Sequence, residues 1–418
     1  FADQEYFRHI KVPGFRVLGP KRKIRNPKSV VHVVTGLTMS KSSWKLAAPG
    51  PKTPILRFPG PIGDTVRKDL AGKPHFQSAV HQFTKGELAQ FIDQHQSVFL
   101  KDERGVGGGN ITNVRIQNID GQKHLTLQSS NPGVVNAAIR LGAAPLESKV
   151  AEKTGNPERP VVLGPWNADR NKALKILAET LAHNAGTRRF NFRNGFYAEA
   201  EIPHLKIQGK PLEVRYVIQK QKDGAYKVMH HFAKIGKLPF ASNITQGGKM
   251  ADTRESVQAA LQEYAPTMDR ADVKALAQSL VDDGAKLSEK LMDVPKKMMR
   301  DDAPGFFSVK DMHVASVPSI LATVDVVFSP RDGKLEPHIM ETHQRGTINL
   351  AKKIRDGTFP AAVGRRMLAL QEFNLKRIAG QLRPLLKKPV PRAWRRLASR
   401  RAKKTRKNYS KRITSRPE

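Results

Sequence analysis

The stretch LEVRYVIQKQKDGAYKVMHHFAKIG, residues 212–236, decides the fold. Apolar and polar residues alternate along both of its halves, which is the period of a half-buried β-strand. Between the halves lies Asp223-Gly224, a dipeptide that is typical of tight hairpin turns. The stretch therefore predicts two antiparallel strands that turn one face toward a core.

The same pattern recurs on both sides of this stretch. Residues 110–128 alternate around Asp120-Gly121, and residues 320–343 alternate around Asp332-Gly333. Apolar residues with helical spacing predict helices between and after the hairpins, at 171–184, 254–264, 273–292, 349–357 and 365–382. Hairpins separated by helices predict the α+β class, with antiparallel sheets.

A further helix is expected to begin at Thr84. Thr84 is followed three residues later by Glu87, and the pair has the spacing of a capping box at a helix start. Leu88, Phe91 and Ile92 then supply an apolar face. The segments 29–37 and 64–70 are expected to form a strand and a short helix.

Composition excludes several classes of protein. The chain has 418 residues, and 39% of them are hydrophobic, which is enough for a sizeable core. It contains no cysteine, so disulfides, thiolate zinc sites and cysteine nucleophiles are ruled out. No apolar run reaches the roughly 20 residues of a membrane helix, so no membrane partner is expected. The sequence also lacks the serine-hydrolase elbow, the zinc-protease motif, the Walker loop and the dinucleotide fingerprint.

The net charge of +36 is the strongest compositional signal. Residues 381–418 hold 15 Lys and Arg against one acidic residue, and a second basic cluster lies at 19–28. A run of charges can be merely a solvated face, but two basic segments on a basic chain favour binding to a polyanion. The residues expected to contact nucleic acid are Lys21, Arg22, Lys23, Arg25, Arg395, Arg396, Arg400, Arg401, Lys403, Lys404, Arg406 and Lys407.

Residues 99–111, FLKDERGVGGGNI, place Lys101 before a glycine-rich turn. Glycine lets backbone N–H groups approach a phosphate closely, so the segment has the composition of a phosphate-binding loop. A glycine-rich turn between two strands has the same composition, and the segment alone does not distinguish the two. Its interpretation depends on whether the rest of the chain supplies partners for a phosphate.

Four segments in one order resemble the ATP-grasp fold over roughly residues 60–380. They are the Lys101 glycine loop, the strand FYAEAEIPHL at 196–205, the hairpin at 212–249, and the hairpin TVDVVFSPRDGKLEPHIMETH at 323–343. The resemblance is to the branch of glutathione-synthetase-like ligases and spore-coat-associated ATP-grasp proteins. It implies two α+β lobes with a cleft between them that holds ATP and Mg²⁺.

The resemblance assigns roles to individual residues. Phosphates would be bound by Lys101, Gly107, Gly108, Gly109 and Lys234, and adenine would be bordered by Glu201 and Ile202. Arg215 and Asn243 would be catalytic, and the positive charges of Arg215 and Lys234 would neutralise a transferring phosphate and an acyl-phosphate intermediate. Asp325 and Glu341 would hold Mg²⁺, with His343 in place of the family's third ligand.

The chain departs from the family pattern at three places. Asp102 replaces the proline after the loop lysine, His343 replaces a metal-binding asparagine, and QRG follows where the family has a Pro-Gly pair. Magnesium prefers oxygen ligands to imidazole. The family's second phosphate-binding lysine has no clear counterpart in 130–195. These departures favour loss of catalysis.

The sequence thus predicts a basic extension at 1–60, an ATP-grasp-like domain at 61–380 with lobes of about 61–200 and 201–380, and a basic tail at 381–418. We expect a structural, RNA-binding component of a large ribonucleoprotein such as a ribosome or organellar ribosome, with other proteins as further partners. The expected compartment is the mitochondrial matrix, another RNA-rich compartment, or a bacterial cytoplasm. Two alternatives remain: an active ATP-dependent carboxylate-amine ligase, and an ATP-grasp protein bound to DNA or packaged in a virion or spore.

Overall fold

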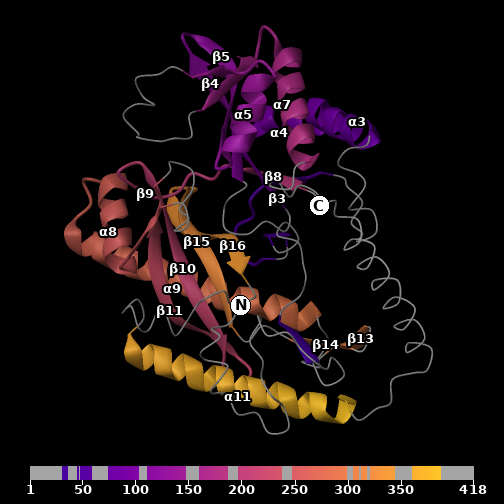
Figure 1. Cartoon of the computed structure of the whole chain (residues 1–418). Coiled ribbons are helices and arrows are strands. Elements are labelled where there is room, and N and C mark those ends of the chain that lie inside the picture. The colour runs from indigo at the N-terminus through magenta and orange to yellow at the C-terminus, as the bar shows by residue number, and fades with distance from the viewer. Residues whose placement is uncertain are drawn as a thin grey trace, which may run out of the picture.

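A computed structural model describes most of the chain. The described residues are 31–35, 45–46, 48–58, 74–102, 111–146, 160–186, 196–237, 247–298, 305–309, 312–317, 321–343 and 360–386. They form a mixed α+β structure with antiparallel sheets, as the hairpin pattern predicts. Figure 1 shows a group of helices and strands above and a second group below.

The upper group is built on a seven-stranded antiparallel sheet, in the order β2-β8-β3-β4-β5-β7-β6. Its helices contribute apolar side chains to one core with the sheet, so they cover one of its faces. The strands are β2 (Ile55–Arg57), β3 (Ser97–Asp102), β4 (Ile111–Ile119), β5 (Gln122–Ser129), β6 (Ala144–Pro145), β7 (Val161–Pro165) and β8 (Phe196–Ala200). The helices are α3 (Pro74–Phe83), η2 (Thr84–Leu88), α4 (Ala89–His95), α5 (Pro132–Arg140) and α7 (Arg170–Gly186).

The lower group is built on a second antiparallel sheet, in the order β12-β11-β10-β15-β16, with β9 paired to β10. Helices α8 and α9 share a core with one face of this sheet. The strands are β9 (Lys206–Ile207), β10 (Lys210–Lys220), β11 (Tyr226–Ile235), β12 (Lys249–Ala251), β15 (Leu321–Arg331) and β16 (Lys334–His343). The helices are α8 (Thr253–Tyr264) and α9 (Arg270–Met298).

The long helix α11 (Ala361–Leu386) packs on the opposite face of the second sheet. Met367 of α11 lies in a small apolar cluster with Val217 of β10 and Phe232 of β11. Val217 and Phe232 point away from α8 and α9, because their neighbours Tyr216 and Ala233 lie in the core on that other side. The second sheet is therefore covered by α8 and α9 on one face and partly by α11 on the other.

A third, small sheet joins distant parts of the chain. Strand β1 (Val31–Thr35) pairs in parallel with β14 (Met312–Val317), which pairs with β13 (Gly305–Val309). Strand β2 likewise lies within the first 60 residues and forms an edge of the seven-stranded sheet by pairing with β8. The segment expected as an N-terminal extension therefore supplies strands to two sheets.

The expected helix start at Thr84 is wrong. Thr84 lies inside a helical run that continues from α3 through η2 into α4, and its hydroxyl donates to the carbonyl of Val80 at 2.7 Å. The residue before it, Phe83, already has helical dihedrals, so there is no cap at this point. A threonine hydroxyl can bond the preceding helical turn instead of starting a new one.

The expected helices at 64–70 and 349–357 lie outside the described residues. Among the helices that the structure describes, none is both long enough and apolar enough to cross a membrane.

Candidate functional site

The site begins on the face of the seven-stranded sheet that the helices leave uncovered. Val98 and Leu100 of β3 point into the helical core, so Phe99 and Lys101 point to the other side. Phe99 lies opposite Glu199 of β8 in the strand register. Lys101 and Glu199 therefore share the face that looks away from the helices.

Two lysines meet at the Glu199 carboxylate. Lys101 Nζ lies 2.7 Å from Glu199 Oε2, and Lys45 Nζ bonds the other oxygen, Oε1. Burial alone would raise the pKa of Glu199, but the two ammonium groups outweigh it and lower this pKa to about 2. Burial lowers the pKa of Lys45 to about 8, against the attraction of Glu199. Glu199 is therefore a buried anion that holds two cations.

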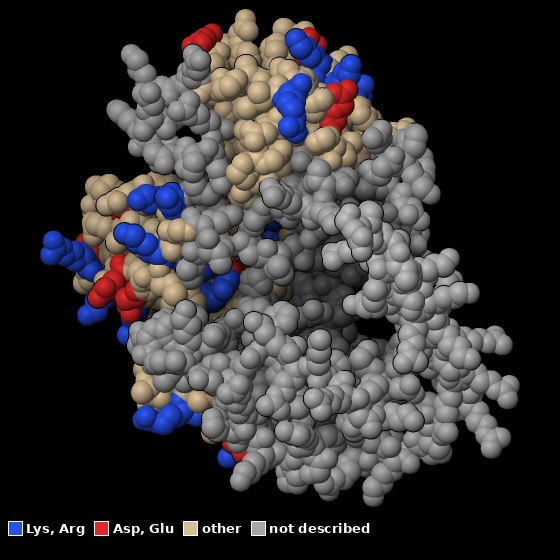
Figure 2. Space-filling view, viewed as in Figure 1, with Lys and Arg blue, Asp and Glu red and all other residues tan. Residues whose placement is uncertain are grey.

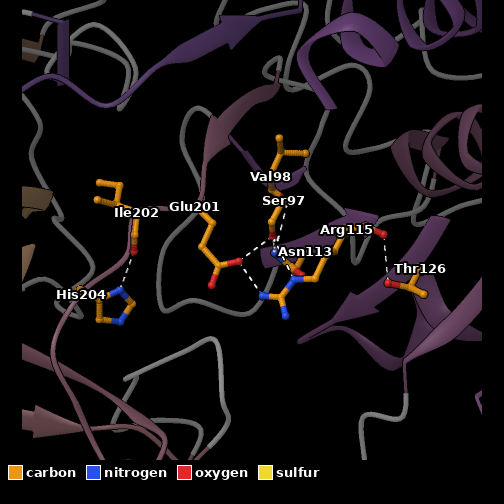
Figure 3. Close-up of polar contacts among 8 residues, drawn as sticks. All are labelled: Ser97, Val98, Asn113, Arg115, Thr126, Glu201, Ile202 and His204. Carbon is orange, nitrogen blue, oxygen red and sulfur yellow. Dashed lines mark hydrogen bonds and ion pairs between the residues drawn. The ribbon is translucent and has the colours of Figure 1, made fainter. Parts of the chain in front are cut away.

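A second ion pair lies on the same face, at the start of β3. Glu201 Oε2 accepts hydrogen bonds from Ser97 Oγ and from Arg115 Nη2, each at 2.5 Å (Figure 3). Asn113 Nδ2 donates to Ser97 Oγ at 3.1 Å. Burial would raise the pKa of Glu201, but the bonds from Ser97 and Arg115 lower it. The Glu201 carboxylate is thus bound by side chains of the seven-stranded sheet, Ser97 of β3 and Arg115 of β4.

Ile202 lies apart from this pair. In Figure 3 its side chain points away from Glu201, and its carbonyl oxygen accepts a hydrogen bond from His204 Nδ1 at 2.8 Å. Residues 201–205 connect the two sheets, and Leu205 N donates to the carbonyl of Phe328 in β15 at 2.9 Å. The connecting segment therefore runs from the first sheet to the second.

A four-membered charge cluster lies on the second sheet, on the face away from α8 and α9. Arg215 of β10 donates from Nε and Nη2 to the two oxygens of Asp325, both at 2.6 Å. Lys234 of β11 donates to Asp325 Oδ2 at 2.9 Å and to Glu213 Oε2 at 2.5 Å. Register explains the cluster, because Glu213 lies opposite Lys234 and Arg215 lies opposite Asp325.

The charged neighbours determine the protonation of this cluster. Burial opposes the charged forms of Arg215 and Lys234, but the carboxylates of Asp325 and Glu213 raise both pKa values above the ordinary range. The side chain of Asp325 is 2% exposed, so its negative charge has little contact with water. The cations Arg215 and Lys234 stabilise this charge inside the protein.

A β-bulge brings Glu341 to the same face. Asp325 pairs with Glu341 and the next residue, Val326, pairs with Ile339, so Met340 is the extra residue. Without the bulge, His338 and Glu341 would point to opposite faces, whereas with it both share the face of Asp325. The Glu341 carboxylate acts on Arg215 of its own sheet and on Lys45 beside the other sheet.

The two polar faces thus meet along a line of charges. Thr53, near β2, lies within hydrogen-bond distance of His338 of β16, with Oγ1 and Nε2 2.5 Å apart. Burial and the nearby Lys45 ammonium lower the pKa of His338 to about 4. We call the eight residues of this line the inter-sheet charge network: Lys45, Lys101, Glu199, Glu213, Arg215, Lys234, Asp325 and Glu341.

Six of the residues expected from the sequence lie on these faces: Lys101, Glu201, Arg215, Lys234, Asp325 and Glu341. The backbone of His343 pairs with Thr323 at the end of β16. Gly107, Gly108, Gly109, Asn243 and the residues expected at nucleic acid in 21–25 and 395–407 lie outside the described residues.

Sequence reasoning missed Lys45, Glu199, Glu213, Arg115 and His338. Glu199 had a detectable signal, because it stands two residues before Glu201 in a strand and must share its face. No local sequence pattern pointed to Lys45, because its partner Glu199 lies 154 residues further along the chain.

The inter-sheet charge network contains four cations and four carboxylates, so it is balanced within the chain. Both oxygens of Asp325 are occupied by cations. In the part of the chain that the structure describes, no three carboxylate or imidazole side chains converge as a metal site requires. A magnesium–triphosphate group needs carboxylate oxygens for the metal and positive charge for the phosphates, whereas Asp325 and the cations Lys101, Arg215 and Lys234 are here bound to one another or to other residues of the chain.

Positive charge is mixed with negative charge on the described surface. Figure 2 shows Lys and Arg interspersed with Asp and Glu on the visible face. Most of the net positive charge belongs to segments outside the described residues. No protein-family model and no curated protein matches the chain.

Proposed function

We propose that the protein is an ATP-grasp-like, RNA-binding structural component of a large ribonucleoprotein, without ligase catalysis. The observation that carries this proposal is the balanced inter-sheet charge network. The lysines and the arginine that would meet phosphates are each bound to a carboxylate of the same chain. An attraction for polyanions must then come from other parts of the chain, chiefly its basic terminal segments.

The ATP-grasp likeness is supported by the arrangement of the sheets. Two antiparallel sheets are joined by residues 201–205 and bring polar faces together, the first backed by helices on its other face and the second backed there by α8 and α9, with α11 covering part of its polar face. The basic segments support the choice of RNA, because phosphate contacts from Lys and Arg bind nucleic acid with little dependence on sequence.

The test compares RNA binding by the full chain and two variants. In the tail variant, Arg395, Arg396, Arg400, Arg401, Lys403, Lys404, Arg406 and Lys407 become Gln. In the control, eight exposed lysines of the described surface become Gln: Lys123, Lys172, Lys175, Lys206, Lys210, Lys274, Lys290 and Lys334. Both variants lose the same charge.

At about 0.15 M salt, the tail variant should bind a mixed-sequence RNA about 100-fold more weakly than the wild type, because several phosphate contacts are lost. The control should stay within about threefold of the wild type. Equal weakening of the two variants would contradict the role of the tail. The purified chain should also retain cellular RNA that about 1 M salt releases.

A second candidate, the ATP-dependent carboxylate-amine ligase, is favoured by one observation. Lys101 and Glu341 come from different sheets, yet the charges of both act on the pKa of Lys45, which supports a common cleft for the two side chains. Magnesium-dependent ATP turnover that is abolished in both Lys101→Ala and Glu341→Ala would establish this candidate. Turnover equal in wild type and variants would exclude it.

A further inference from the structure

Helix α11 presents a row of basic side chains to solvent. Arg365, Arg366, Lys376 and Arg377 are exposed, and Phe373, which lies between them in sequence, is 37% exposed. Arg365 and Arg377, at the two ends of the row, are separated by about 18 Å along the helix axis. We call Arg365, Arg366, Phe373, Lys376 and Arg377 the α11 basic face.

The other side of α11 is firmly attached to the second sheet. Met367 and Asn374 are buried. Gln219 Nε2 donates to the carbonyl of Met367 at 2.7 Å, and Asn374 Nδ2 donates to the carbonyl of Lys220 at 2.9 Å. The buried side of α11 therefore fixes the orientation of the helix on the sheet. The side chains of the α11 basic face take no part in these contacts.

The charges of this face are mostly unopposed. Lys376 pairs with Glu372, one turn earlier, at 2.7 Å. Within the described part of the chain, no carboxylate pairs with Arg365, Arg366 or Arg377. Figure 2 shows Lys and Arg side chains at the lower left, where Figure 1 places one end of α11.

The helices on the opposite side of the sheet differ. In α8 and α9, acidic residues alternate with basic ones, as in Asp272 before Lys274 and Glu289 before Lys290. Exposed cations on those helices therefore have nearby carboxylates in sequence. Among the side chains of α11 that the structure describes, there are instead four exposed cations and one acid, Glu372. The second sheet has a mixed side and a basic side.

A membrane surface is a poor match for the α11 basic face. A helix that lies on a bilayer inserts an apolar face, and Val363, Met367 and Leu368, among the described apolar residues of α11, already pack on the sheet. Phe373 is its one large exposed apolar residue among those described. A polyphosphate chain matches better, because it needs spaced guanidinium groups and no apolar insertion.

We propose that the α11 basic face binds the phosphate backbone of RNA. The site rests on the proposed function, and it adds a binding surface on the folded body to the basic terminal segments. The helix leads directly into residues 387–418, so one RNA strand can contact both the helix and the tail. Arg365 and Arg366 would hold phosphates at one end of the face, and Lys376 and Arg377 would hold phosphates at the other.

The experiment uses the full chain with four substitutions, Arg365→Gln, Arg366→Gln, Lys376→Gln and Arg377→Gln. The matched control replaces Arg254, Arg270, Lys274 and Lys290, four exposed cations of α8 and α9, with Gln. The tail variant is measured alongside. Affinity for a mixed-sequence RNA is determined at several salt concentrations, and thermal unfolding confirms that each variant is folded.

The α11 variant should bind RNA at least tenfold more weakly than the control at about 0.15 M salt. The slope of its log K against log[salt] should be less negative by about two to three, because fewer counterions are released. Equal affinity of the α11 variant and the control, with the tail variant weakened, would overturn this proposal and leave the proposed function intact. No RNA binding by the wild type would overturn both. An α11 variant that loses binding to anionic vesicles but not to RNA would also overturn the proposal.

Discussion

At Glu199, two lysines from distant parts of the chain bond one buried carboxylate, whose side chain is 1% exposed. Replacing it with Gln leaves Lys45 and Lys101 without that charge. Breaking a buried ion pair by removing one partner typically costs about 3–5 kcal/mol. We therefore expect Glu199→Gln to lower the free energy of unfolding at pH 7 by an amount in this range, measured by urea denaturation.

The control for this substitution is Glu372→Gln. Glu372 forms an exposed pair with Lys376, and such pairs contribute about 0–1 kcal/mol. If Glu199→Gln were no more destabilising than Glu372→Gln, Glu199 would not be holding two buried cations.

His338 makes stability depend on pH. Burial and the Lys45 ammonium lower its pKa in the folded protein to about 4, from an ordinary value of 6.5. The unfolded chain therefore takes up the proton first, and stability is lost as the pH falls from 6.5 to 4. The loss from this group is on the order of 3 kcal/mol.

His338→Asn should remove this part of the pH dependence. We expect the difference in unfolding free energy between pH 7 and pH 4.5 to be smaller in His338→Asn than in the wild type. Urea denaturation at intermediate pH values provides the curve. Parallel curves for wild type and His338→Asn would show that the imidazole does not stay neutral in the fold.

Among the elements, the hairpins could be predicted because their signals are local. Asp120, Gly121, Asp332 and Gly333 all have positive φ, which is the backbone that an Asp-Gly turn between strands requires. Period-two alternation then determines which side chains share a face. The face of Arg215 followed from the same rule.

The rest of the site depends on contacts between distant segments. Lys45 bonds Glu199 from a distant part of the chain, and Glu341 shares the face of Asp325 only because Met340 forms a bulge. A bulge reverses the alternation after it and has no reliable signature in a single sequence. The prediction of a helix start at Thr84 was wrong for a related reason. Tertiary packing continues the helix through a residue type that often precedes a helix.

The packing of α9 on the second sheet gives an element-scale prediction. A Cβ at Gly284 of α9 would lie 2.4 Å from the hydroxyl oxygen of Tyr216 in β10. That hydroxyl donates to the carbonyl of Val281 at 2.9 Å, so it is not free to move. Gly284→Ala should therefore lower the unfolding free energy by about 1–3 kcal/mol, although alanine favours helices.

Gly86→Ala is the matched substitution. Gly86 is also helical, and a Cβ there would meet nothing within 4 Å. It should be neutral or stabilising by up to about 1 kcal/mol in the same urea experiment. A Gly284→Ala variant as stable as Gly86→Ala would mean that α9 does not approach β10 this closely.

At the scale of the whole molecule, charge is divided between two settings. Inside, the inter-sheet charge network balances its cations with carboxylates of the same chain. The excess that gives +36 lies elsewhere in the chain, most of it in segments beyond the described residues. This division is the reason for proposing a folded body that is held in an RNA assembly by peripheral basic surfaces.

The most direct measurement of this central claim is the affinity of the full chain for a mixed-sequence RNA as a function of salt. If peripheral Lys and Arg neutralise many phosphates, log K should fall linearly with log[salt], with a slope steeper than about −4. Adding magnesium and ATP should leave that line unchanged. A slope near zero, or no binding at about 0.05 M salt, would contradict the account.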